Sequence, residues 1–258
     1  MAWDPDYIDF ISEYCDRWCE RCPLTQRCVV FSRENDPKQI QASEEAVEKA
    51  MEDLRVELSM PDPPARPWLD EMLHEQGPER EQQEPDRVYE ERQRRVHANP
   101  MRVVAMDYAV DAHTWIRLYD EPTRARVEAA VNEQRGGADE SAAIVRMETE
   151  AVLNALSVVA WDCSLIAAKL GRAIRGKEDG WESFIDDPLQ TDFNGSAKLT
   201  LLLVERSESA WHLIARWAPD RDMPTQFANT LAALRADVER AFPNARRFVR
   251  PGFDEMAT

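Results

Sequence analysis

The fold is decided by the stretch Leu153-Asn154-Ala155-Leu156-Ser157-Val158-Val159-Ala160-Trp161-Asp162-Cys163-Ser164-Leu165-Ile166. It holds neither glycine nor proline, and its apolar residues are interrupted on one face by a single acid, Asp162. A pattern of this length is typical of a core helix rather than a strand. We expect the longest helix of the chain here, from about Asp139 to Arg175 and ending before Gly176.

Similar helical patterns extend through the rest of the chain on both sides. Helices are predicted to start at Asn99-Pro100 and Glu121-Pro122 (the latter stopping at Gly136-Gly137), at Asn194 or Ser196 (to Trp217) and at Pro224-Thr225 (to Phe242). Phe248, Val249 and Phe253 should pack on the body from an irregular tail broken by Pro243 and Pro251-Gly252. No segment shows strand alternation between hairpin turns. The sequence therefore predicts an all-α bundle of five to seven helices.

Composition excludes several classes of protein. The 258 residues include 49 Asp or Glu and 32 Lys or Arg, for a net charge of −17, and only 8 glycines. Such acidity argues against nucleic acid and anionic membranes as partners. No run reaches the roughly 18–20 consecutive apolar residues of a membrane span, and the start does not resemble a signal peptide. We expect a soluble, cytoplasmic protein of undetermined oligomeric state.

The chain is predicted to have three parts. Residues 1–59 form N-terminal helices, one beginning at Asp4-Pro5 and one from Ser43 to about Leu58, with Val47, Met51, Leu54 and Leu58 as its apolar stripe. Residues 60–98 are rich in proline and charge and are expected to form an exposed connector with short helical pieces, with a polar recognition arm as the alternative. Residues 99–258 form the bundle and its tail, compact with residues 1–59.

Four of the five cysteines lie close together in the N-terminal part. Their spacing is Cys15-x3-Cys19-x2-Cys22-x5-Cys28, and the fifth, Cys163, is expected to be a buried small hydrophobe. On a helix the first three thiols share one face, and Pro23 turns the chain so that Cys28 closes the site. In a reducing compartment this cluster predicts metal ligation, with disulfides, a redox switch or plain packing as alternatives.

Helix geometry favours an iron–sulfur cluster over zinc. Tetrahedral zinc needs sulfurs roughly 3.8 Å apart. On a straight helix the Cα atoms of Cys15 and Cys22 would be about 10.5 Å apart. A [4Fe-4S] cluster spans its ligands more widely, so it is the expected cofactor, with Zn as the alternative.

Residues 19–28, Cys19-Glu20-Arg21-Cys22-Pro23-Leu24-Thr25-Gln26-Arg27-Cys28, resemble the Cys-x2-Cys-Pro-x4-Cys segment of the WhiB-type iron–sulfur regulators. The resemblance implies that Cys19, Cys22 and Cys28 are [4Fe-4S] ligands. Cys15 stands in place of that family's distant first cysteine. The family's Gly-Trp-Gly-Gly turn and basic tail are missing, so DNA binding is not implied.

Two further resemblances concern the same region. Residues 14–22, 194–198 and 242–246 are similar to segments of an uncharacterised family of bacterial helical proteins with an N-terminal cysteine cluster. This resemblance implies a bacterial source but does not indicate any particular activity. The spacing Cys15-x3-Cys19-x2-Cys22 also matches radical-SAM enzymes, but those place it in a loop after a barrel strand, and none is predicted here.

Charged residues inside the predicted helices are the remaining site candidates. Asp162 and Lys169 are seven apart on one helix, and Lys198 and Glu205 are seven apart on the next. Packed together they would form a buried charged network, either a structural ion pair or a proton-transfer site. No phosphate loop, HExxH, Gly-x-Ser-x-Gly or paired Glu-x-x-His pattern is present.

These observations define one expected function and two alternatives. The expected function is redox sensing or electron transfer by an iron–sulfur cluster on Cys15, Cys19, Cys22 and Cys28, coupled to binding of a protein partner. The first alternative is a zinc-stapled interaction module without redox activity. The second is a metal-dependent enzyme that uses the charged helical core, so whether the protein is an enzyme remains open.

Overall fold

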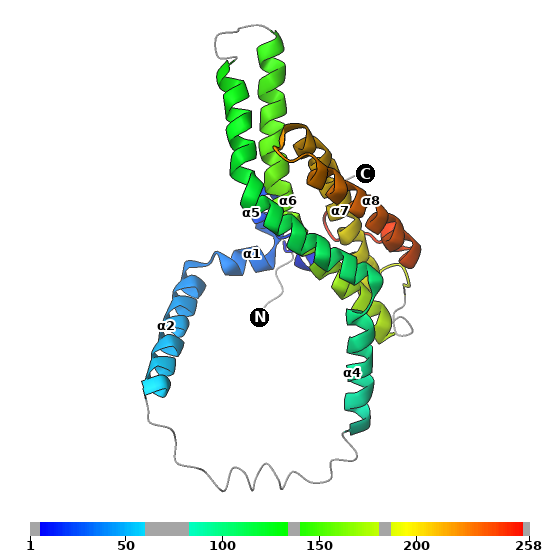
Figure 1. Ribbon diagram of the computed structural model, residues 1–258. Helices are drawn as coiled ribbons and strands as arrows, with labels where there is room; N and C mark the ends of the chain where they lie inside the picture. The colour runs from blue at the N-terminus through cyan, green and yellow to red at the C-terminus, as the bar shows by residue number, and fades with distance from the viewer. Residues whose placement is uncertain (1–5, 60–82, 134–139, 181–186, 255–258) are drawn as a thin grey trace. The chain divides into compact units, whose positions relative to one another are not determined.

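The computed structural model describes residues 6–59, 83–133, 140–180 and 187–254, and within them the chain is all-α. These residues form seven α-helices and no strand, which confirms the predicted fold class (Figure 1). The helices are α1 (Val29–Glu34), α2 (Pro37–Ser59), α4 (Gln83–His97), α5 (Pro100–Glu133), α6 (Glu140–Asp179), α7 (Asp192–Trp217) and α8 (Asp222–Ala241).

The chain divides into two compact units. One comprises residues 1–91 together with the C-terminal residues 251–258, and the other comprises residues 92–250. Part of the predicted connector, residues 60–82, lies outside the described residues. Its remainder is the helix α4, whose Arg92 and Arg95 pair with Asp179 and Glu178 at the end of α6 at 2.9 and 3.1 Å.

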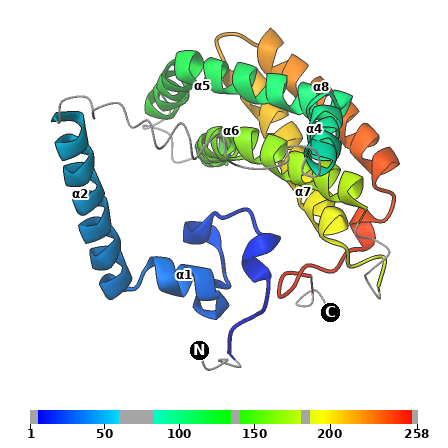
Figure 2. The same cartoon turned by 90° about the horizontal axis from the view of Figure 1, so that it is seen from below.

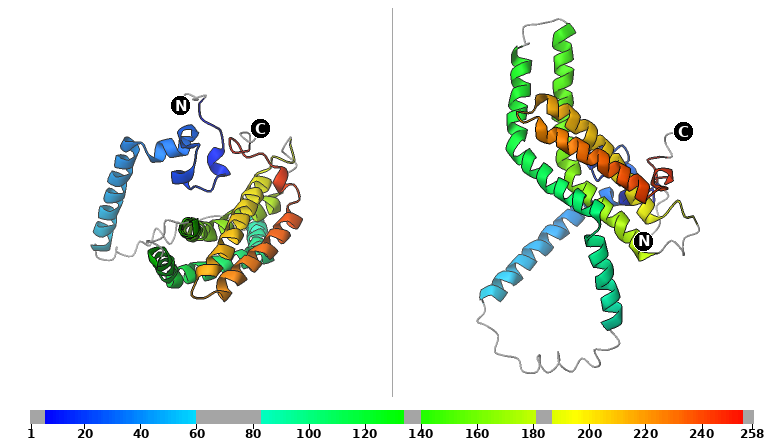
Figure 3. Two further views of the ribbon diagram at one scale, coloured as in Figure 1. Left: turned by 90° about the horizontal axis from the view of Figure 1, so that it is seen from above. Right: turned by 45° about the vertical axis from the view of Figure 1, so that its right-hand side comes forward.

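The second unit is a four-helix bundle. α6 packs on α5 and α7, and α8 packs on α7 and on α5, so the four helices enclose one core. Figures 2 and 3 show α7 and α8 side by side and inclined to the α5–α6 pair. α7 is the most buried of the four, because it carries apolar or small side chains on most of its circumference.

Aromatic side chains fill the centre of this core. The Trp211 indole N–H donates to the Tyr108 hydroxyl at 2.9 Å, and the Trp211 ring lies edge-on to Trp115 with centroids 5.2 Å apart. Phe227 contacts both Trp211 and Tyr108. Because α5, α7 and α8 each contribute rings, this cluster fixes the angles at which the helices cross.

A buried charge crosses the α6–α7 interface. Asp162 is fully buried, and the Arg206 guanidinium donates to both of its carboxylate oxygens at 2.6 and 2.8 Å. The Ser207 hydroxyl donates a third hydrogen bond at 3.2 Å. A carboxylate without water needs such compensation, so Asp162 tolerates only one register of α7 against α6.

Several predicted helix boundaries are wrong for local reasons. α5 continues through Pro122, where a new helix was predicted to begin; the hydroxyl of Thr123 donates to the Tyr119 carbonyl in the turn that lacks the proline N–H. α6 passes Gly176 and ends before the left-handed Gly180. α7 is capped by Thr191, whose hydroxyl accepts from the Asn194 N–H, and not by Asn194 or Ser196.

The predictions for the second N-terminal helix and for the C-terminal tail are partly confirmed and partly wrong. The helix predicted from Ser43 exists but begins six residues earlier, at Pro37. Its stripe residues Val47, Met51 and Leu54 are exposed. In the tail Phe248 is buried as predicted, whereas Val249 is exposed.

One helix in the described part of the chain is long and apolar enough to cross a membrane. It is the segment Ala143–Asp179 of α6, and half of its most apolar window is buried inside the bundle. Core helices of bundles have the same composition, since neighbours cover them on several sides.

The Asp162–Arg206 pair yields the first prediction. Arg206→Ala should lower the free energy of unfolding by about 3 kcal/mol, because it leaves the buried carboxylate without its charged partner. Urea denaturation of the full chain measures the difference. The matched control is Arg240→Ala, which breaks the exposed pair with Asp237 and should cost less than about 1 kcal/mol. Equal losses in the two variants would contradict the argument.

Candidate functional site: the cysteine cavity

The cysteine segment does not form the predicted helix. Phe10 and Arg17 adopt left-handed backbone conformations with φ of 59° and 58°, which an α-helix cannot contain. The Asp16 carboxylate also accepts a hydrogen bond from the Trp18 N–H at 3.1 Å, an arrangement that replaces helical hydrogen bonds with a turn. The chain from Ile11 to Arg27 consequently runs through three short 3₁₀ turns, Ile11–Glu13, Cys19–Arg21 and Thr25–Arg27.

Each cysteine occupies the edge of one of these turns. Cys15 follows the first turn, Cys19 begins the second and Cys22 ends it, and Cys28 caps α1. The prediction that three thiols share one helical face is therefore wrong. The distance of about 10.5 Å expected for Cys15 and Cys22 on a straight helix no longer separates iron–sulfur from zinc ligation.

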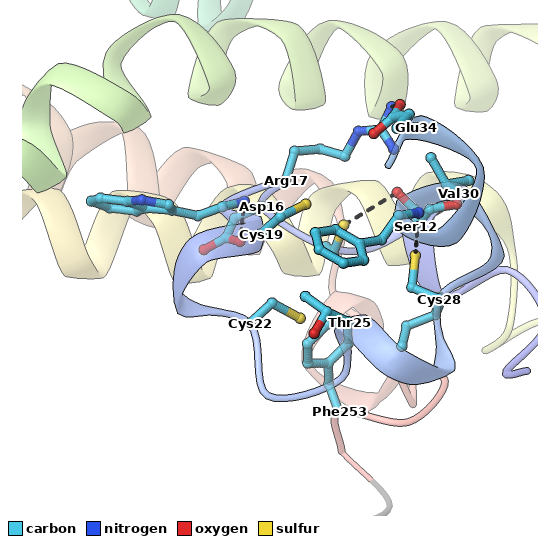
Figure 4. A pocket seen from close by; sticks show the side chains of 14 residues that line it. Ser12, Asp16, Arg17, Cys19, Cys22, Thr25, Cys28, Val30, Glu34 and Phe253 are labelled. Carbon is cyan, nitrogen blue, oxygen red and sulfur yellow. Dashed lines mark hydrogen bonds and ion pairs between the residues drawn. The ribbon is translucent and has the colours of Figure 1, made fainter. Parts of the chain in front are cut away.

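The turns nevertheless bring all four thiols to one cavity. Cys15, Cys19, Cys22 and Cys28 all line a space of about 380 Å³, part of it open to solvent. Figure 4 shows the side chains of Cys19 and Cys22 directed into this space, with Thr25 and Phe253 beside them. The four thiols are half-buried and none forms a disulfide.

Two of the sulfurs have hydrogen bonds that hold them in place. The Cys28 sulfur accepts from the Phe31 N–H at 3.5 Å, so it takes the role of the N-cap of α1. The Cys15 thiol donates to the Ser12 carbonyl at 3.4 Å. Backbone N–H groups directed at sulfur stabilise thiolates and tune the potential of clusters bound to them.

Burial and neighbouring charges shift the pKa of Cys19. Burial raises the pKa of Cys19, and the neighbouring Cys22, Cys28 and Glu34 raise it further, while Arg17 opposes them. Negative charges that disfavour a lone thiolate favour binding of a cation among them.

The C-terminal tail completes the cavity wall. Phe253 lines the cavity beside the cysteines. The preceding Gly252 has φ of 74°, and a Cβ there would lie 2.7 Å from Ile8 Cδ1 and 3.4 Å from Leu24 Cδ1. A residue with a Cβ would be strained at this φ and would require the end of the Ile8 side chain to shift. Sequence reasoning placed Phe253 on the body and missed its role here, although Pro251-Gly252 was the available signal of a turn.

Two arginines, Arg17 and Arg21, interact with residues that line the cavity. The Arg21 guanidinium lies 3.6 Å from the centre of the Trp18 ring, and Arg17 pairs with Glu34 at 3.6 Å. Trp18, Arg17 and Glu34 all line the cavity. The segment before the cysteines is held by two hydrogen bonds. The Tyr7 hydroxyl donates to the Ser32 hydroxyl, and the Ile8 N–H donates to the Arg27 carbonyl, each at 3.0 Å.

Four thiols form the donor set for the predicted cofactor. Among the described residues, no group of three or more His, Cys, Asp or Glu side chains is arranged to hold a metal ion. The four thiols nevertheless line the same cavity. Four soft sulfur donors are the ligand type that iron–sulfur clusters and zinc both use.

The charged candidates of the bundle are found in different surroundings. Asp162 is held by Arg206 and Ser207, two partners that sequence reasoning did not identify. Lys198 donates to the Phe248 carbonyl. Glu205 pairs with Arg246, which also binds Glu239.

Two further predicted residues lie on α6. Lys169 is half-buried. Cys163 is buried as expected, and burial raises the pKa of its thiol, as for a small apolar side chain.

The chain matches no protein-family model, no curated protein and no solved structure. The cavity must therefore be interpreted from its own residues.

The close approach at Gly252 yields a prediction about access to the thiols. Gly252→Ala should displace the tail and open the cavity, because the new Cβ meets Ile8 and the backbone becomes strained by about 1–3 kcal/mol. The metal-free protein should then react faster with a disulfide reagent in its native state. Gly180→Ala is the control, since Gly180 has φ of 68° but no atom within 4 Å of the added Cβ. Equal reaction rates for Gly252→Ala and the unaltered protein would contradict the assignment.

The charges around Cys19 yield a second prediction. In the metal-free protein the pH midpoint for alkylation of Cys19 should lie above that of an unperturbed thiol. Cys22→Ser should lower this midpoint by removing a like charge, and Arg17→Gln should raise it by removing the cation. Mass spectrometry of the peptide after iodoacetamide pulses at increasing pH measures each midpoint. Shifts in the opposite directions would refute the electrostatic account.

Proposed function

We propose that Cys15, Cys19, Cys22 and Cys28 hold an iron–sulfur cluster of the [4Fe-4S] type, and that the protein uses it for redox sensing or electron transfer coupled to a protein partner. The observation that carries the proposal is that four thiols from one short segment line one cavity. Four cysteine thiolates form a complete ligand set for such a cluster, without a contribution from elsewhere in the chain.

The resemblance of residues 19–28 to the WhiB-type segment supports iron over zinc. When bound, the cluster would supply one-electron oxidation and reduction.

The residues around the cluster have separate tasks. Phe253 and Trp18 restrict water, and the Phe31 N–H stabilises negative charge on the Cys28 sulfur. Because burial and neighbouring thiolates raise the pKa of Cys19, loading the cluster must release the Cys19 proton. Loading should therefore weaken as pH falls. Full ligation by four cysteines suits electron transfer or sensing in a reducing, cytoplasmic setting.

A protein partner is supported by exposed apolar side chains in the same unit. Phe10 lies at the edge of the cysteine segment, and it is 72 % exposed. Its backbone is held in the left-handed conformation. On α2, Ile40, Val47, Met51 and Leu54 recur at helical spacing and are exposed. Apolar groups displayed in this way are typical of contact surfaces.

Anaerobic purification tests the cofactor. The protein should be brown and absorb near 400 nm, with about four iron and four sulfide per chain, and dithionite should bleach the absorption. Cys19→Ser, Cys22→Ser and Cys28→Ser should each lose most of the iron, because a ligand is removed. Cys163→Ser is the matched control, because that thiol lies in the bundle, and it should keep its iron.

Two outcomes would overturn the proposal. A colourless protein with about one zinc per chain would identify the zinc-stapled interaction module. Iron that persists in all of the cysteine cluster variants would show that these thiols are not the ligands.

A further inference from the structure

A groove between α5 and α6 in the second unit has no role in the proposed cysteine chemistry. It encloses about 810 Å³ of empty space, part of it open to solvent. One wall is a stripe on α5 that includes Arg102 and Met106, and the other is a stripe on α6 that includes Ser164, Gly171 and Arg175. Residues at these spacings face the same side of each helix.

The groove is cationic within an acidic chain. Three arginines line it, and no acidic side chain is among the described residues that do so. Arg172 is neutralised by Asp192, to which it donates two hydrogen bonds of 2.6 and 3.0 Å. Arg102 and Arg175 form no ion pair or hydrogen bond with any side chain in the described part of the chain. Among the described residues, therefore, no side chain compensates the positive charges of these two guanidinium groups through an ion pair or hydrogen bond.

The two arginines belong to the same end of the groove. Gly171 lies opposite Arg102, since a Cβ added to Gly171 would be 3.8 Å from Arg102 Nε. Arg175 follows Gly171 by four residues, one turn along the same face of α6. The other end of the groove is formed by Met106, Ala109 and Ser164. The groove is thus charged at one end and mainly apolar at the other.

We infer that this groove binds a small organic phosphate whose phosphate lies between Arg102 and Arg175 and whose flat apolar part lies toward Met106 and Ser164. Two free guanidinium groups match the charge of a phosphate, whereas a carboxylate would leave one of them uncompensated. The volume greatly exceeds that of phosphate itself, and the small side chains of Ala168 and Gly171 leave a floor on which a ring can lie. Nucleotides combine these two properties.

Calorimetric titration of the full chain with ADP, pyrophosphate and adenosine tests the inference. ADP should bind with a micromolar dissociation constant, and both pyrophosphate and adenosine should bind more weakly by about tenfold or more, because each lacks half of the contacts. Arg102→Gln and Arg175→Gln should each weaken ADP binding by about tenfold. Gly171→Leu should abolish it by filling the floor of the groove.

The matched control is Arg117→Gln, which removes an exposed arginine of α5 that does not line the groove. It should leave the affinity for ADP unchanged, and melting curves confirm that all variants fold. Absence of ADP binding at about 1 mM, a range in which even weak specific sites are occupied, would overturn the inference. An equal loss in Arg117→Gln would also overturn it, because the binding would then reflect general charge attraction.

Discussion

The cysteine cavity depends on two left-handed residues, Phe10 and Arg17. A side chain with a Cβ resists this conformation, so each must be held there by its surroundings. The turn closed by Asp16 on the Trp18 N–H holds Arg17, and the buried side chain of Ile11 fixes the chain directly after Phe10. Without these two reversals the segment would continue as a helix, and Cys15 and Cys22 would be separated along its axis. With them, thiols from three successive turns reach one space.

The cysteine segment depends on irregular backbone, whereas the bundle consists of regular helices. A few polar contacts in the apolar core fix the register of these helices. Sliding α7 along α6 by one turn would separate Asp162 from Arg206 and leave a bare carboxylate in a site without water. The Trp211–Tyr108 hydrogen bond imposes the same requirement between α7 and α5. Apolar side chains tolerate small displacements, whereas these directional contacts do not, so they select one arrangement among many of similar apolar burial.

This contrast explains what could be predicted from the sequence. Helical periodicity over α6, α7 and α8 is strong because each helix buries a continuous face, and their existence and approximate limits were predictable. The residues 6–28 also show helical spacing, but this spacing arises from turns that close a cavity. Positive φ at Phe10 and Arg17 has no signature in residue type, since neither is glycine or asparagine. The four cysteines were identified by their density alone, whereas the place of Phe253 in the cavity wall was missed, because it depends on a tail more than 200 residues away in the chain.

The net charge of the whole chain determines which anions can bind in the arginine groove. With a net charge of −17, the long-range field repels anions, but at physiological salt it is screened beyond about 8 Å. Most arginines with a described partner bind a carboxylate, as Arg206, Arg216 and Arg246 do. Arg102 and Arg175 differ in facing a groove whose described lining includes no carboxylate. In the proposed complex, an anion between them would gain short-range contacts that distant, screened acids oppose only weakly. The acidic surface repels polyanions that bind only by long-range charge. It therefore favours ligands that also make short-range contacts in the groove.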